Sequence, residues 1–236
     1  FENSTTALAV AWPVGAAARA ELGAARFEDR IEQNQSPDFL RTSRDSVDAQ
    51  VDWRLSPRHV LGAGGMLSDE QASTESYGER MHSDTRQLNL FVQDRIEAGA
   101  QRALLALGYT DHETAGDAVT WNLEYGYTLA AGTLLYGLAG TGFRAPDATD
   151  RYGFGGNPDL EPEQSRNLEV GVRHRFAGRH TVSLSAFRND IDDLIEFVTL
   201  SYDPFDGENR NVQQARIEGI EASYEYGHGP WRGRLE

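Results

Sequence analysis

Residues 119–129 read VTWNLEYGYTL and carry the pattern that decides the fold. The odd positions are apolar or aromatic, namely Val119, Trp121, Leu123, Tyr125, Tyr127 and Leu129. The even positions are polar or small, namely Thr120, Asn122, Glu124, Gly126 and Thr128. Because successive side chains of a β-strand point to opposite sides, this stretch predicts a strand with one apolar face and one polar face.

The same two-residue alternation recurs along most of the chain. It is clear in residues 47–55, 87–93, 167–173, 182–186 and 220–224, with Phe91 as an exception on a polar face. The pattern fits two classes of fold. A soluble sandwich turns its apolar faces inward, whereas a transmembrane barrel turns its apolar face outward to lipid. Alternation alone does not separate the two classes.

The connections between the expected strands favour the barrel. Short turns are expected at residues 13–16, 56–58, 98–100, 130–132, 177–179 and 227–230. Longer polar stretches are expected at residues 34–45, 73–84, 112–118, 146–164 and 199–212. Short and long connections thus alternate through about twelve strands, which is typical of outer-membrane barrels, with tight periplasmic turns and longer extracellular loops. A sandwich with Greek-key crossovers has no reason to follow this order.

Aromatic residues gather near the ends of the expected strands. Seven lie near short turns, namely Trp12, Trp53, Tyr127, Tyr136, Phe176, Tyr226 and Trp231. Trp121 and Tyr109 lie at the other end, beside a longer stretch. Two aromatic belts at the two membrane interfaces are the expected pattern for a transmembrane barrel.

The amino-acid composition further limits the class of protein and the partners it can bind. The 236 residues carry a formal net charge of −15, and hydrophobic residues make up 39% of them. No stretch approaches the ~18 consecutive apolar residues of a membrane-spanning helix, although barrel strands, being alternating, average out as polar. The acidic balance argues against nucleic acid as a partner, since that requires a basic surface. The sequence has no cysteine, so it holds no disulfide and no thiolate metal site.

Four motifs occur in a fixed order in the second half of the chain. They are Phe-Arg-Ala-Pro (143–146), Gly-Asn-Pro-Asp-Leu-Glu-Pro-Glu (156–163), Phe-Arg-Asn-Asp-Ile-Asp-Asp-Leu-Ile (187–195) and Ala-Arg-Ile-Glu-Gly-Ile-Glu-Ala (215–222). In order and spacing they resemble the late barrel strands of TonB-dependent outer-membrane receptors. Within that family the chain is most similar to the cobalamin (vitamin B12) receptors, which carry a similar Tyr-Gly-Phe stretch before Gly-Asn-Pro, here residues 152–154.

The resemblance implies an all-β fold, a transmembrane antiparallel up-and-down barrel. The family builds 22 strands around an N-terminal plug domain. Residues 1–236 would supply about twelve of those strands, so they form a partial barrel domain. The chain begins without a signal peptide and ends at Arg-Gly-Arg-Leu-Glu, without the aromatic residue that closes such barrels. We therefore expect the plug and the closing strands to lie outside this sequence.

The resemblance also implies a function. Extracellular loops and the plug would bind cobalamin, and TonB, contacting the N-terminal region, would supply the energy for import across the bacterial outer membrane. Lipid and lipopolysaccharide would surround the barrel, and no enzymatic activity is expected. The alternatives are a siderophore or haem receptor of the same family and a non-transporting barrel such as an autotransporter translocator or porin. A soluble carbohydrate-binding sandwich is the third alternative.

Six residues are candidates for ligand contact. Thr74 and Tyr77 lie in the polar stretch 73–84, which corresponds to a ligand-contacting loop of the cobalamin receptors. Arg144 lies at the end of the strand that opens the longest expected loop, 146–164, and the loop itself contributes Arg151, Tyr152 and Phe154. Structural roles compete with these assignments, because Pro146 ends strand pairing and residues 153–163 are rich in turn formers.

Other polar residues have expected roles outside ligand binding. A set on the polar strand faces would hydrogen-bond the plug, namely Gln50, Asp52, Asn122, Glu124 and Glu169. Acidic clusters at 189–193 and 203–208 lack the spacing of a Ca²⁺ loop, so neither a metal nor a cofactor is expected in this chain. The resemblance would place Ca²⁺ on early-strand loops outside it. The six histidines show no Ser-His-Asp arrangement, in line with a protein that is not an enzyme.

Arg216 and Glu218 pose a geometric problem. They share strand parity with Ile220 and therefore with the expected lipid face. A basic side chain facing lipid at the bilayer midplane costs about 2–4 kcal/mol, and an acidic one somewhat less. We expect either a change of strand parity near these residues or a position outside the hydrocarbon layer.

Overall fold

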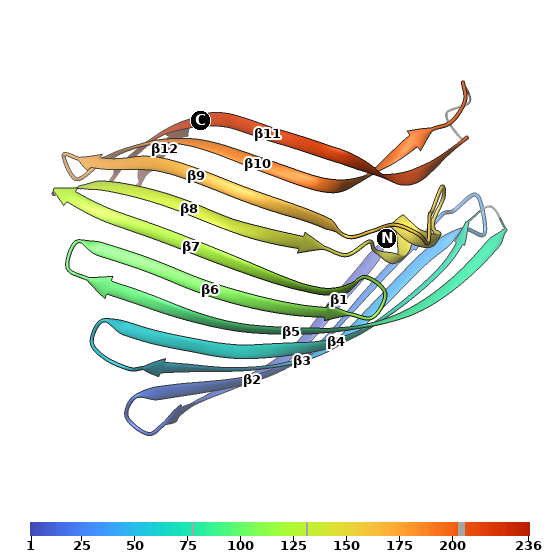
Figure 1. Ribbon diagram of the computed structural model, residues 1–236, viewed down its shortest axis with the longest axis horizontal. Coiled ribbons are helices and arrows are strands. Elements are labelled where there is room, and N and C mark those ends of the chain that lie inside the picture. Colours follow the sequence, from blue (N-terminus) through green and yellow to red (C-terminus); the bar gives the residue numbers. More distant parts are fainter. Residues whose placement is uncertain (77, 131, 203–205) are drawn as a thin grey trace.

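The computed structural model describes residues 1–76, 78–130, 132–202 and 206–236. These residues form one antiparallel sheet of twelve strands, each paired with the next along the chain (Figure 1). The strands are β1 Glu2–Val14, β2 Ala18–Glu32, β3 Phe39–Arg54, β4 His59–Ser76, β5 Glu79–Ala98, β6 Gln101–His112, β7 Gly116–Ala130, β8 Thr133–Arg144, β9 Glu163–Phe176, β10 His180–Thr199, β11 Gly207–His228 and β12 Trp231–Leu235. A short helix, α1 Ala148–Tyr152, lies between β8 and β9. The antiparallel up-and-down arrangement is confirmed.

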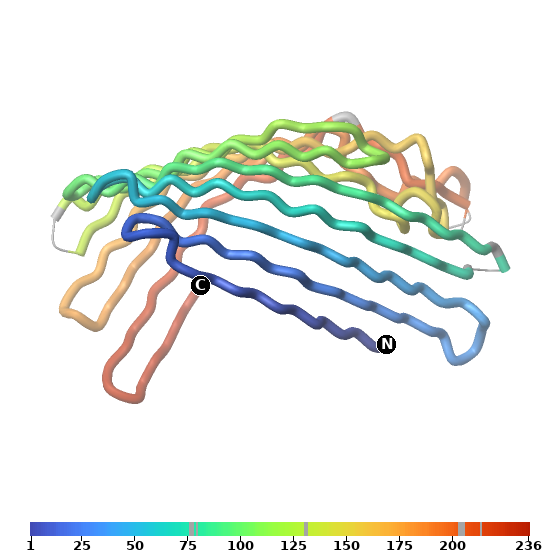
Figure 2. The backbone as a smooth tube through the Cα atoms, turned by 90° about the horizontal axis from the view of Figure 1, so that it is seen from below, coloured from blue at the N-terminus to red at the C-terminus, as the bar shows by residue number. Residues whose placement is uncertain are grey.

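The sheet bends into an open trough (Figure 2). Within the described residues, β1 pairs only with β2 and β12 only with β11, so these two strands are the free edges. The short turns lie at the left end of the sheet in Figure 1 and the other connections at the right end. No helix in the described part of the chain is long and apolar enough to cross a membrane.

Five of the six short turns form where expected, and the sixth, 130–132, includes residue 131, which lies outside the described residues. Most of the longer connections are shorter than expected. β3 already begins at Phe39, inside the polar stretch 34–45, and β4 and β5 leave only residues 77–78 between them. The polar stretches 112–118 and 199–212 shrink to 113–115 and 200–206. These strand ends are polar on both faces, so they show no alternation, yet they remain paired as hairpins. The strict alternation of short and long connections is therefore wrong at β4–β5 and at β6–β7, and within the described residues 145–162 is the one long loop.

The register gathers the apolar side chains on one face of the sheet. Leu107 lies opposite Trp121, and Leu105 lies opposite Leu123, on neighbouring strands. These side chains are uncovered: Leu107 is 56% exposed and Trp121 44% exposed. Among the described residues, the hydrophobic side chains that are buried are Ala20, Ala72 and Leu160. The fold thus has an exposed apolar face in place of an internal core, which the soluble sandwich does not explain.

Aromatic side chains on the other face lie over glycines of the neighbouring strand. Phe91 pairs with Gly64 and Tyr136 with Gly171. A Cβ atom on these glycines would lie 2.8 Å from the Phe91 ring and 2.4 Å from the Tyr136 ring. The glycines therefore make room for rings on the polar face, which accounts for Phe91 as an exception. Tyr136 belongs to this face and not to the aromatic belt in which it was expected.

The chain keeps its parity through Arg216 and Glu218. Arg216 pairs with Asp190 and Glu218 with Arg188, in one unbroken register with Ile220. Both residues lie beyond Ile220 towards the β10–β11 connection. Arg216 Nε donates to Asp190 Oδ1 at 2.7 Å, and Arg188 Nε donates to Asp190 Oδ2 at 2.7 Å. Of the two expected alternatives, the change of strand parity is therefore wrong, and a position outside the hydrocarbon layer stays a prediction. Asp190 partly neutralises the two arginines.

Candidate functional site

The loop 145–162 covers the polar, concave face at the end opposite the short turns. Its first residues, with strands β3 to β6 and β8, line a cavity of about 270 Å³. Hydroxyl and amide side chains dominate the strand side of this cavity, namely Ser68, Thr85, Gln87, Asn89 and Thr110. Phe143, Pro146 and Asp147 close it from the loop side. The arrangement suits a neutral ligand group that both donates and accepts hydrogen bonds.

The helix α1 is short and is held at its first turn by two aspartates. The backbone N–H of Asp150 donates to Asp147 Oδ1 at 2.8 Å, and the backbone N–H of Asp147 donates to Asp150 Oδ2 at 3.1 Å. This reciprocal pair is a capping box that satisfies free N–H groups at the helix start. Five residues are too few for a helix to persist alone, so the caps and the contacts around it fix its position.

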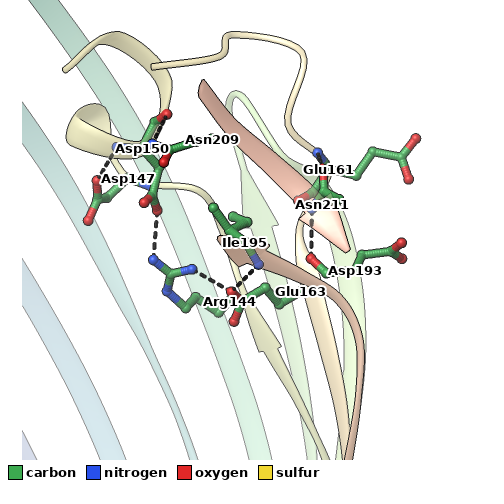
Figure 3. Close-up of polar contacts among 9 residues, drawn as sticks. All are labelled: Arg144, Asp147, Asp150, Glu161, Glu163, Asp193, Ile195, Asn209 and Asn211. Carbon is green, nitrogen blue, oxygen red and sulfur yellow. Dashed lines mark hydrogen bonds and ion pairs between the residues drawn. The ribbon is translucent and has the colours of Figure 1, made fainter. Parts of the chain in front are cut away.

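Arg144 joins the two strands that flank the loop to the helix. Its guanidinium donates to Glu163 Oε1 at 2.8 Å and to Asp150 Oδ2 at 2.6 Å, as Figure 3 shows. The same Glu163 oxygen accepts from the backbone N–H of Ile195 at 2.9 Å. The motif residues at the ends of β8 and β9 therefore form one network that also reaches β10.

Asparagines at the start of β11 fasten the other side of the loop. Asn209 Nδ2 donates to the Asp150 carbonyl at 3.0 Å, and Asn157 Nδ2 donates to the Asn209 carbonyl at 3.1 Å. Asn211 exchanges two hydrogen bonds of 2.9 Å with the backbone of Glu161 (Figure 3). Residues 50 or more positions apart in the chain thus share one set of hydrogen bonds. Sequence reasoning missed Asn209 and Asn211, whose only signal is the Asn-Arg-Asn sequence at 209–211.

Aromatic and guanidinium contacts complete the loop. Phe154 stacks on Phe197 of β10 with ring centroids 5.7 Å apart. Arg151 donates to the carbonyls of Pro158 at 2.8 Å and Thr114 at 3.3 Å, which ties the loop to the β6–β7 hairpin. Tyr152 and Phe154 keep 40% and 46% of their surface exposed. The loop is therefore fastened to the β6–β7 and β10–β11 hairpins while two aromatic rings remain accessible.

Two ionisable residues in the cavity wall are not free charges. Arg44 Nε donates to Glu70 Oε2 at 2.8 Å, so the cavity's arginine is already neutralised. His112, the last residue of β6 and beyond its apolar side chains, is only 9% exposed. Burial lowers the pKa of His112, and the nearby Arg151 lowers it further, so the imidazole is neutral at pH 7.

The structure brings four of the six predicted ligand residues together. Arg144, Arg151, Tyr152 and Phe154 all belong to the loop 145–162 and its flanking strand end. Thr74 lies on β4 outside the cavity lining, and its hydroxyl donates to the Phe39 carbonyl at 2.9 Å. Tyr77 lies outside the described residues. Ligand contact by these side chains stays a prediction, since both arginines also hold the loop in place.

Replacing Arg144 with methionine is expected to loosen the loop without unfolding the sheet. The change removes the bonds to Glu163 and Asp150. Charge-assisted bonds of this kind are strong, but the half-exposed guanidinium is screened by solvent, so we expect amide hydrogen exchange in 148–157 to rise by about 5-fold. Arg80→Met, which removes an exposed pair with Glu75, is the matched control. Unchanged exchange in the loop would contradict the fastening role of Arg144.

Comparisons with known proteins agree with this architecture. A family model described as "TonB dependent receptor-like, beta-barrel" matches residues 9–235. The vitamin B12 transporter BtuB of Vibrio vulnificus (strain YJ016) is 31% identical over 189 residues, covering 77% of this chain and 30% of the relative. The chain therefore spans less than a third of that relative's length.

Solved structures show the same fold at low identity. The siderophore receptor PirA from Pseudomonas aeruginosa superposes with a TM-score of 0.79 at 18% identity, over 99% of this chain and 50% of that one. A variant of the ferric enterobactin receptor PfeA from the same organism, in complex with enterobactin, gives a TM-score of 0.76 at 18% identity, over 94% and 41%. The family match favours a receptor over an autotransporter translocator or a porin. This chain belongs to the TonB-dependent receptor β-barrel family.

Proposed function

We propose that these residues form part of an outer-membrane receptor that imports cobalamin with energy supplied through TonB. The observation that carries the choice of ligand is the chemistry of the 270 Å³ cavity. Five hydroxyl or amide side chains line its strand side, and its arginine is paired with Glu70. Its other carboxylate, Asp147, accepts the Asp150 backbone N–H and leaves no cation free for an anionic ligand. Cobalamin is neutral overall and carries many amide side chains, so such a wall complements it. Ferric catecholates are strongly anionic and are disfavoured in a chain of net charge −15.

The size of the cavity fits one arm of a large ligand. About 270 Å³ is at the low end for a site that encloses a whole small molecule. We infer that an amide arm of the corrin ring enters the cavity while the ring lies against the accessible faces of Tyr152 and Phe154. The 31% identity to a vitamin B12 transporter supports this ligand over a siderophore, since the solved receptors PirA and PfeA named above are 18% identical to the chain.

The polar face supports a further part of the proposal. Gln50 donates to Asp52 at 3.0 Å, and Asn122 donates to Glu124 at 2.9 Å, so these side chains extend along the concave wall. Glu169 accepts from the Tyr136 hydroxyl at 3.1 Å. Such a wall complements a polar domain within the barrel, and we propose that the plug contacts it. TonB would bind outside residues 1–236, and the apolar face would contact outer-membrane lipid and lipopolysaccharide.

Direct binding tests the ligand. The full-length receptor, purified in detergent, is titrated with cyanocobalamin with and without Ca²⁺. Tight binding that other corrinoids displace and ferric siderophores do not displace supports the proposal. Displacement by a ferric catecholate, or no corrinoid binding, would assign the receptor to another substrate.

A paired substitution tests the cavity itself. Gln87→Ala combined with Asn89→Ala removes two amide groups from the cavity wall. Each lost hydrogen bond is worth about 0.5–1.5 kcal/mol, so we expect roughly 10-fold weaker cyanocobalamin binding. Gln71→Ala, which removes an exposed amide of β4 outside the cavity lining, is the matched control and should leave affinity unchanged. Equal affinity of the double variant and the wild type would remove the cavity from the binding site.

A further inference from the structure

The pattern of apolar and polar side chains reverses at the ends of β2 to β5 that lie opposite the short turns (Figure 1). Nearer the middle of the strands, the convex side carries the apolar face, as in the row Val47, Leu67 and Leu88. At the strand ends the row on the convex side is polar, namely Arg30, Arg41, Ser73 and His82. One position nearer the strand ends lies a row on the concave side, which we call the apolar row, namely Ile31, Leu40, Thr74 and Met81.

The apolar row has no lipid to cover it. Its neighbours on the convex side are charged or polar, so this part of the sheet lies beyond the hydrocarbon layer, and the row itself faces the concave side. Ile31 keeps 39% of its surface exposed, and Leu40 and Met81 are half-buried. Thr74 is the one polar member of the row, and its hydroxyl already donates to the Phe39 carbonyl at 2.9 Å. Apolar side chains that face water in this way indicate an apolar partner.

The apolar row and the amide-lined cavity belong to the same wall. The register runs without a break from Thr74 and Met81 to Glu70 and Thr85, which line the 270 Å³ cavity. The two pairs are separated by about 13 Å along extended strands. The pair between them on the concave side is Ala72, which is 3% exposed, and Ser83. Both are small, so a ligand about 13 Å long reaches the row and the cavity together.

Such a ligand carries hydrogen-bonding groups at one end and an apolar group at the other. Cobalamin meets this requirement, because amide side chains surround its corrin ring and its nucleotide arm carries the flat, apolar dimethylbenzimidazole base. Methionine and aliphatic side chains make favourable contacts with aromatic rings. We propose that the apolar row binds this base while an amide side chain occupies the cavity. Leu40 and Met81 then select among corrinoids with different bases. This subsite rests on the proposed import of cobalamin and extends it, since the cavity alone does not distinguish corrinoids that share the corrin ring.

Two corrinoids separate the contribution of the base from that of the ring. Dicyanocobinamide keeps the corrin ring and its amide side chains but lacks the base, whereas cyanocobalamin carries both. The double variant Leu40→Gln, Met81→Gln replaces two apolar groups of the row in the full-length receptor, purified in detergent. We expect cyanocobalamin to bind about 10-fold more weakly, because the base loses its apolar contact. The affinity for dicyanocobinamide should change by less than about 2-fold.

A corrinoid whose base is adenine gives a second readout. Adenine has ring nitrogens and an amino group that hydrogen-bond in water, so burying it against the apolar row costs more than burying dimethylbenzimidazole. The wild type should therefore bind cyanocobalamin about 5-fold or more tightly than the adenine corrinoid. The double variant should bring this ratio close to one. Equal affinity of the wild type for the two corrinoids would contradict selection of the base by the row.

The adjacent side chains on the convex side give the matched control. Arg41→Gln with His82→Gln changes the neighbours of Leu40 and Met81 that face away from the concave side, so affinity for all three corrinoids should stay unchanged. Heat-modifiable mobility confirms that each variant is folded, and Met81→Gln alone replaces a double variant that fails to fold. If the folded variant weakened cyanocobalamin and dicyanocobinamide equally, or weakened neither, the subsite would be overturned and the proposed import of cobalamin would stand. A wild type that binds neither corrinoid would overturn both.

Discussion

Leu107→Arg is expected to destabilise the membrane-inserted barrel by about 2–4 kcal/mol, because it places a charge on the lipid face near mid-depth. Leu107 lies between Val92 and Trp121 in the register, and all three belong to the exposed apolar face. Lipid supplies no water to solvate the guanidinium, and the carboxylate of Asp94, which lies opposite Leu105 on β5, is already bonded to His59 at 2.8 Å. The nearest acidic side chain on the same face of β6 is Asp111, two alternating positions away.

Ala106→Arg is the matched control for this change. Ala106 precedes Leu107 and pairs with Gln93 and Asn122 on the polar face. Arginine there meets polar groups, so we expect less than about 1 kcal/mol of destabilisation. The full-length receptor would be refolded into lipid vesicles and unfolded with urea, with heat-modifiable mobility as the assay. Equal destabilisation by the two variants would contradict the assignment of the two faces.

The apolar and polar faces of the sheet could be predicted from sequence because successive side chains of a strand must point to opposite faces. The alternation in 119–129 forces apolar and polar side chains to opposite sides, and the register of β6 to β8 aligns each side with its neighbours. The short turns could also be predicted from sequence. In the expected turn 177–179, for example, Gly178 has a φ of +64°, which a tight hairpin turn requires. Local chemistry decides both features, so a single sequence is enough.

The length of the strands and the hydrogen bonds that hold the loop 145–162 could not be predicted from the sequence. β3 and β5 continue into polar stretches where neither face needs to be apolar, so no pattern distinguishes strand from loop there. The hydrogen bonds of Asn209 and Asn211 reach residues 50 or more positions away, and only the folded sheet brings these partners together. The motifs at 143–146 and 156–163 could be found in the sequence. The hydrogen bond that joins them, from Arg144 to Glu163, could not be predicted because it depends on how the two strand ends lie in the folded sheet.

Gly155→Ala is expected to open the loop 145–162 strongly, because two separate costs add at this position. Gly155 has φ +64, a conformation that costs an L-residue about 1–2 kcal/mol. An added Cβ would also lie 2.4 Å from the Phe197 ring and 3.0 Å from the Gly207 carbonyl. Overpacking of this kind typically costs a further 1–3 kcal/mol. The ring that Phe154 stacks on would have to move, and the loop would lose its contact with β10.

Gly178→Ala separates the two costs. Gly178 has the same φ of +64, but a Cβ there would meet nothing within 4 Å. Only the conformational cost of about 1–2 kcal/mol remains, and it falls on the β9–β10 turn at the other end of the sheet. The double variant Gly155→Ala with Phe197→Leu removes part of the ring and should recover some of the loss. The Gly207 carbonyl still prevents full recovery.

The rate of tryptic cleavage after Arg151 in the folded receptor measures the opening of the loop. Arg151 is held by the Pro158 and Thr114 carbonyls, so trypsin reaches it only when the loop has opened. A difference of about 2 kcal/mol in opening corresponds to roughly 30-fold faster cleavage. The two costs at Gly155 add to at least about 2 kcal/mol, so we expect an increase of roughly 30-fold or more for Gly155→Ala and none for Gly178→Ala. If both variants left the rate unchanged, Gly155 would not be packed against Phe197 as the structure has it, and the loop would be held by its polar contacts alone.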